Sequence, residues 1–87
     1  MAEEDPEQIV SDVARRISEI RLGLGLTQET AAERLGMSLK GYQRIERGLQ
    51  NLTLKRLARV ATMLGVRPMD LLAVPASREV RKGRPRR

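Results

Sequence analysis

Three side chains with strong hydrogen-bonding groups follow a helical spacing near the middle of the chain. Lys40 and Arg44 are four residues apart and Gln43 lies three residues after Lys40, so on a helix they share one face. Arginine or lysine on such a face can donate to O6 and N7 of guanine, and a glutamine amide can pair with adenine. A solvated helix surface would have the same pattern, so the surrounding elements have to separate the two interpretations.

Composition narrows the other chemistry that the chain can perform. The sequence has no His and no Cys, which removes the usual zinc ligands and the most common general base. Its acidic residues are scattered, and no nucleophile lies beside a base in any pattern that indicates an active site. We therefore expect no catalytic residues, no metal and no cofactor.

Length and hydropathy indicate one small domain. Eighty-seven residues are near the lower limit for a domain that folds without disulfides or metals. No apolar run approaches the roughly 18 residues of a membrane span, and no signal peptide is visible. The absence of Cys fits a reducing compartment. These features predict a cytoplasmic protein that does not bind a membrane.

The formal charge of +6 is unevenly distributed. Residues 1–7 carry four acids and no base, residues 8–77 carry eleven bases and six acids, and residues 78–87 carry six bases and one acid. An acidic leader, a basic body and a basic tail suit a polyanionic partner. A soluble surface with a disordered tail is an equally good interpretation of charge alone.

Local signals place the polar face on the second of two short helices. Thr27 and Ser38 are N-cap candidates, and Gly36 between them can adopt the left-handed conformation that ends a helix. These signals predict helices at about 28–35 and 39–47. The apolar residues expected to face inward are Ala31, Ala32, Leu35, Met37, Tyr42 and Ile45.

Flanking segments are also helical. Asp5-Pro6 starts a helix at about 6–22, with Gln8 at the capping-box position, and Gly23 with Gly25 ends it. Its apolar stripe consists of Ile9, Val13, Ile17 and Ile20, and Leu24 and Leu26 are expected to pack inward after it.

Two further helices follow. Thr53 caps one that ends before Gly65, and Pro68 opens a short one at about 68–73. The face of the first that we expect to be buried consists of Leu54, Leu57, Ala58, Val60, Ala61 and Leu64. After Val74-Pro75 the chain has almost nothing apolar to bury, and no segment has the pattern of a strand.

The five-helix pattern resembles the phage-repressor and Cro-like family of helix-turn-helix DNA-binding domains, also called the XRE family. The match is carried by Leu26-Thr27-Gln28-Glu29, Ala32, Leu35-Gly36-Met37-Ser38, Ile45-Glu46-Arg47-Gly48, Asn51, Thr53-Leu54, Leu57, Ala61, Leu64-Gly65-Val66 and Asp70-Leu71-Leu72. The resemblance implies an all-α, compact lambda-repressor-like domain over 6–74. We expect an acidic leader at 1–5 and a basic disordered tail at 75–87.

The resemblance also assigns roles to the polar face. The family's base-reading positions fall on Leu39, Lys40 and Arg44, with Gln43 adjacent. Leu39 is apolar and can offer only contact to a thymine methyl group. The residues that the resemblance implies as phosphate contacts are Gln28, Arg47, Asn51 and Lys55. Gln28 has the alternative role of an ordinary helix-start residue.

Other positions have structural roles in the family or depart from its pattern. Glu46 matches a residue that commonly pairs with an arginine at the end of the first helix, here Arg21. Gly41 lies inside the second helix of the motif, where it weakens the helix or lets the backbone approach DNA. Tyr42 occupies a position usually held by an aliphatic residue, so its hydroxyl needs a partner.

The tail resembles an AT-hook around Lys82, Gly83, Arg84 and Pro85. Such an element lies in the minor groove of A·T-rich DNA, where arginine is favoured by the negative potential of a narrow groove. A nonspecific electrostatic arm is the alternative, and we favour it.

Two functions remain open. The leading hypothesis is a sequence-specific regulator, such as a repressor, that binds double-stranded DNA in the nucleoid as a homodimer, with Val66, Met69 and Leu72 as interface candidates. The alternative is a protein-interaction module, such as an antitoxin or adaptor, that binds DNA nonspecifically through its tail.

Overall fold

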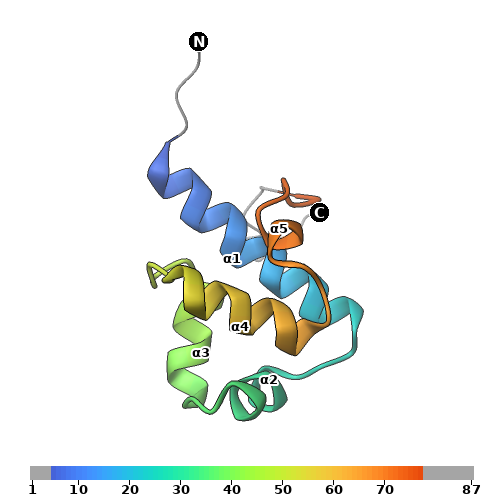
Figure 1. The fold of residues 1–87 in the computed structure, drawn as a ribbon. Coiled ribbons are helices and arrows are strands. Elements are labelled where there is room, and N and C mark those ends of the chain that lie inside the picture. Colours follow the sequence, from blue (N-terminus) through green and yellow to red (C-terminus); the bar gives the residue numbers. More distant parts are fainter. Residues whose placement is uncertain (1–4, 78–87) are drawn as a thin grey trace, which may run out of the picture.

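A computed structural model describes residues 5–77, which form helices and connecting loops without a strand (Figure 1). The helices are α1 (Pro6–Gly23), α2 (Gln28–Leu35), α3 (Leu39–Glu46), α4 (Leu54–Leu64) and α5 (Pro68–Leu71). In the view of Figure 1, α2 and α3 lie together at the bottom of the domain, while α1 and α4 pass above them. The predicted all-α class is confirmed.

The helix starts are set by side-chain caps. At the N-caps of α1 to α4, a side-chain oxygen accepts a backbone N–H of the first turn; these residues are Asp5, Thr27, Ser38 and Thr53. Gly36 and Gly65 end α2 and α4 with φ of 69° and 73°, the left-handed region that glycine adopts without steric penalty. The Asp5 side chain accepts the Glu7 N–H at 3.1 Å and not the Gln8 N–H of a capping box, and the Gln8 amide donates to Asp12 Oδ1 at 2.8 Å.

The ends of three helices differ slightly from the prediction. α1 continues one residue further, to Gly23, and α3 ends one residue earlier, at Glu46. α5 stops at Leu71 instead of residue 73. Frayed last turns account for such differences, because the terminal carbonyls have no partner in the helix.

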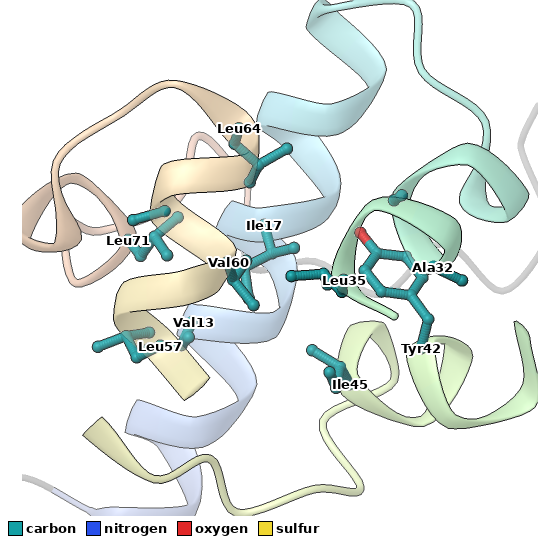
Figure 2. Packing of buried hydrophobic residues seen from close by; sticks show 12 residues of the cluster. Val13, Ile17, Ala32, Leu35, Tyr42, Ile45, Leu57, Val60, Leu64 and Leu71 are labelled. Atoms are coloured by element: carbon teal, nitrogen blue, oxygen red, sulfur yellow. The ribbon is translucent and has the colours of Figure 1, made fainter. Parts of the chain in front are cut away.

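One apolar core joins the helices (Figure 2). Its largest fully buried side chains come from four helices: Tyr42, Ile17, Leu71 and Val60. Burying a side chain of this size stabilises the fold by roughly 1.5–3 kcal/mol. Because α3 contributes Tyr42 and Ile45, its inner face is fixed to the rest of the domain.

Three positions predicted to be buried are exposed. Leu54 is 82% exposed and Ala58, one turn later, is also exposed, so the buried stripe of α4 is narrower than expected. Leu54 is the first residue of α4, beyond the edge of the core. Leu24 is 53% exposed because it caps the end of α1, while Leu26 packs against the core.

The chain after α5 packs back onto α1. Pro75 is buried, and the Glu19 carboxylate accepts the backbone N–H groups of Ala76 at 3.2 Å and Ser77 at 3.3 Å. Arg16 Nε donates to the Asp70 carbonyl at 2.9 Å. The packed chain thus continues three residues beyond the boundary expected at 74.

Candidate nucleic-acid interface

The turn between α2 and α3 is held by short-range contacts. The Met37 N–H donates to the Ala32 carbonyl at 3.0 Å, and the Ser38 hydroxyl accepts the Gly41 N–H at 3.0 Å. A Cβ atom built at Gly41 would lie 3.1 Å from Ser38 Oγ and 3.3 Å from Met37 Cε. Packing inside the domain therefore accounts for a glycine at this position of α3, since a side chain would crowd the Ser38 cap and the Met37 side chain in the turn.

Arg21 and Glu46 form the ion pair that the resemblance implied. Arg21 Nε donates to Glu46 Oε2 at 2.6 Å, and Arg21 Nη2 donates to Glu46 Oε1 at 3.0 Å. The two side chains are only 9% and 5% exposed. A third donor atom, Arg21 Nη1, binds the Leu26 carbonyl at 2.7 Å, so the pair joins α1, the α1–α2 loop and α3.

Three more side chains extend this pair into a network. The Tyr42 hydroxyl donates to Glu46 Oε2, which provides the partner that a buried tyrosine needs. Gln28 Nε2 donates to Glu46 Oε1 at 3.0 Å, and Gln28 Oε1 accepts from Gln43 Nε2 at 3.1 Å. We call Arg21, Gln28, Tyr42, Gln43 and Glu46 the buried network; it connects the start of α2 to both faces of α3.

Electrostatics keep the central pair charged. Burial by itself raises the pKa of Glu46, but hydrogen bonds from Arg21, Tyr42 and Gln28 outweigh it and lower that pKa overall. The hydrogen bond to Glu46 is the largest effect on the pKa of Arg21, which is raised. Burial, followed by the Glu46 carboxylate, raises the pKa of Tyr42, so its hydroxyl stays protonated as a donor.

The predicted base-contacting residues on the outer face of α3 differ in their exposure to solvent. Lys40 and Arg44 are exposed, and Arg44 Nε lies 3.3 Å from Gln50 Oε1, at the loop after α3. Leu39 and Gln43 are half-buried, and Gln43 is held by Gln28. Lys40 and Arg44 are thus the two of these side chains most accessible to a partner.

The predicted phosphate contacts also fall into two groups. Arg47, Asn51 and Lys55 are exposed at the end of α3, in the following loop and in the first turn of α4. The side chain of Gln28 is already engaged at both its oxygen and its nitrogen. The tail positions 82–85 lie outside the described residues.

No group of acidic side chains among residues 5–77 is arranged to hold a metal ion. No helix in this range is long and apolar enough to cross a membrane.

Sequence reasoning found the Arg21–Glu46 pair but missed the rest of the buried network. The spacing of Tyr42 and Glu46, four residues apart, was a usable signal for their contact. The Gln28–Gln43 hydrogen bond joins residues 15 apart in the sequence and has no local signature.

The fold and this surface define an all-helical helix-turn-helix domain. A family model described as "Helix-turn-helix" matches residues 17–71, which is more than half of the chain. The chain belongs to this family, of the phage-repressor and Cro-like (XRE) type.

A curated relative and several solved structures are similar to the chain. An "uncharacterized transcriptional regulator in ATPase CF(0) region" of Rhodospirillum rubrum is 40% identical over 58 residues, which are 67% of this chain and 53% of the relative. The chain therefore spans about half the length of that protein.

Two solved structures cover most of their own chains. The hypothetical transcription factor NHTF from Neisseria has a TM-score of 0.74 at 28% identity and covers 86% of this chain and 87% of its own. The restriction-modification controller protein C.AhdI from Aeromonas hydrophila has a TM-score of 0.67 at 32% identity, covering 71% and 94%. An HTH_3 family regulator from Vibrio cholerae, at 24% identity and a TM-score of 0.71, supports the fold alone and covers 77% of this chain and 38% of its own.

Proposed function

We propose that the protein is a transcriptional regulator that places α3 in the major groove of double-stranded DNA and reads sequence there. The observation that carries this proposal is the contrast between the two faces of α3. The inner face is fixed by Tyr42 and by Glu46 of the buried network, while Lys40 and Arg44 are exposed at a spacing of four residues. A rigidly held helix with exposed donors is what base readout requires.

The remaining contacts of the proposal position the domain without reading sequence. Arg47, Asn51 and Lys55 contact phosphates on one side of α3, and the free N–H groups at the start of α2 contact a phosphate on the other. Because the Gln28 side chain is used internally, its contribution is to orient Gln43 and Glu46. The basic tail adds affinity that is sensitive to salt.

A homodimer on a two-fold-related operator completes the proposal. One domain offers few base contacts, and a two-fold axis doubles them at a spacing of about one helical turn, roughly 34 Å. The similarity to proteins named as transcriptional regulators and as a restriction-modification controller supports this class of function.

Selection of genomic fragments by the purified protein tests the proposal. We expect the wild type to enrich a palindromic site. Lys40→Ala and Arg44→Ala should each lose about 1–3 kcal/mol of binding free energy and relax the preference at one base position. Arg67→Ala removes the same charge from an exposed site directly before α5, a helix that does not pack on α3, and serves as the matched control.

Two further variants separate readout from electrostatics. Lys55→Ala is expected to weaken binding to all sequences alike and to reduce the salt slope by about one. Equal retention of all fragments by the wild type and Arg44→Ala, abolished when Lys82 and Arg84 are replaced by Ala, would contradict sequence readout by α3. That outcome would support the protein-interaction module with a nonspecific tail.

A further inference from the structure

A polar cleft lies between α1 and the end of α3. We call it the polar cleft and define it by Ser11, Arg15 and Ser18 of α1, Arg47 after α3 and Ser77 after α5. Its volume of about 300 Å³ is at the lower end of the roughly 300–1,000 Å³ of small-molecule sites. The space therefore suits one compact polar group.

Close packing holds the two helices of the polar cleft at a fixed separation. A Cβ atom built at Gly48 would lie 3.6 Å from Ser11 Cα and 3.7 Å from Ala14 Cβ, so the chain at the end of α3 touches α1. The Arg21–Glu46 ion pair of the buried network connects the same two helices. A ligand therefore meets walls that are already in place, which lowers the entropic cost of binding.

The charged residues that line the polar cleft differ in whether they are already paired. The Glu46 carboxylate accepts hydrogen bonds from the buried network. Glu19 pairs with another arginine of α1 and accepts two N–H groups from the chain after α5. Arg15 and Arg47, in contrast, form no ion pair within the described part of the chain. The cleft therefore keeps two uncompensated positive charges, which attract an anion.

The donors of the polar cleft match a phosphate group. A guanidinium binds phosphate oxygens through two parallel N–H···O bonds. Ser11 and Ser18 add hydroxyl donors on the same face of α1 as Arg15, at spacings of four and three residues. A tetrahedral phosphate can accept from α1 and from Arg47 at the same time, because its oxygens point in different directions. A carboxylate has only two oxygens in one plane and fits this set of donors less well.

We propose that the polar cleft binds one phosphate group between Arg15 and Arg47. Arg15 is then a contact that lies outside the helix-turn-helix. The phosphate belongs either to the DNA backbone, which anchors α1 to the duplex beside α3, or to a small phosphate compound in solution, which competes with DNA for Arg47. The first source rests on the proposed function, and the second does not.

Titration of the full chain with inorganic phosphate, followed by NMR, tests the cleft without DNA. With ionic strength held constant by chloride, we expect saturable shifts of the Nε–H signals of Arg15 and Arg47 and of the Ser18 amide. The dissociation constant should rise on the order of tenfold in Arg15→Gln, because a charged donor is lost. Arg67→Gln, at an exposed arginine that does not line the cleft, is the matched control and should bind phosphate like the wild type.

Duplex binding at several salt concentrations identifies the source of the phosphate. If it belongs to the DNA backbone, Arg15→Gln should weaken binding to all sequences alike and reduce the salt slope by about one, whereas Arg67→Gln should leave the slope unchanged. If it belongs to a small compound, inorganic phosphate should displace the duplex from the wild type more strongly than chloride does at equal ionic strength. That excess should vanish in Arg15→Gln, with an unchanged salt slope.

The proposal fails if phosphate shifts none of the cleft signals and Arg15→Gln has the same salt slope as Arg67→Gln. Circular dichroism should show both variants folded, because Arg15 has no ion pair to lose within residues 5–77. Sequence preference is assigned to Lys40 and Arg44, so enrichment of a site that depends on Arg44 would leave the proposed DNA readout standing without the cleft. Phosphate binding by a protein that selects no DNA site would have the opposite meaning, so the two failures are distinguishable.

Discussion

Replacing Glu46 with Gln should severely destabilise the domain although it changes the side-chain shape very little. Glu46 accepts two hydrogen bonds from Arg21, one from Tyr42 and one from Gln28. Glutamine has one oxygen acceptor, and its NH2 group would face donors at the other position. The Arg21 guanidinium, in a side chain 9% exposed, would lose its counter-charge.

The expected loss follows from the burial of the pair. Removing one partner of a buried ion pair costs about 3–5 kcal/mol, because the other charge remains buried. A domain of this size has a free energy of unfolding at the low end of about 5–15 kcal/mol. At about 4–8 °C per kcal/mol, the melting temperature should fall by about 12 °C or more.

Thermal and urea denaturation followed by circular dichroism measure this loss. Glu33→Gln makes the same chemical change on the exposed face of α2 and should stay within about 0.5 kcal/mol of the wild type. In Arg21→Met/Glu46→Gln no charge is left buried, so the double variant should lose less than the sum of the single variants, by on the order of 1–3 kcal/mol. Equal stability of Glu46→Gln and Glu33→Gln, or additivity in the cycle, would refute this reasoning.

Four further predictions concern the titration of Glu46, the titration of Tyr42, the core and a helix end. Folding lowers the pKa of Glu46, so the stability that this carboxylate contributes is present above the unfolded pKa of about 4.3 and is lost as pH falls through the folded pKa. The urea midpoint of the wild type should therefore fall on acidification, and that of Glu46→Gln should fall less steeply. Tyr42 is the only aromatic residue and its pKa is raised, so tyrosinate absorbance should appear only above the ordinary tyrosine pKa of about 10, together with unfolding. Ionisation of Tyr42 at the ordinary pKa in the folded protein would contradict its burial. Ile17→Ala, at a fully buried site, should cost about 2–5 kcal/mol in urea denaturation, and Leu22→Ala, 64% exposed, much less; similar losses would argue against this core. Gly36→Ala should lower the unfolding free energy by about 1–2 kcal/mol because φ there is 69°, and an unchanged melting temperature would exclude the left-handed cap.

The buried network explains how α3 is held in place in so small a domain. The chain has no Cys and no His, so neither a disulfide nor a zinc site built from those ligands fixes the helix. Glu46 and Tyr42 instead connect it to Arg21 at the end of α1, beneath the surface proposed to meet DNA. Loss of the network should therefore reduce stability and sequence readout together.

The sequence by itself determined the helices and their order. The caps at Thr27 and Ser38 and the left-handed glycine Gly36 act through bonds within three or four residues, so their effect is readable from local sequence. The Arg21–Glu46 pair was predicted from the family resemblance, because residues 25 apart leave no local pattern.

The tertiary structure alone decided which side chains are covered. Leu54 follows the apolar pattern of α4 but lies at its first residue, at the edge of the core, and is 82% exposed. Gln28 and Gln43 look like surface amides in the sequence, yet packing α2 against α3 brings them into hydrogen-bonding distance. Periodicity reports which face of a helix is apolar, whereas burial also depends on how far the opposing helices extend, and that is fixed only when all of them are packed.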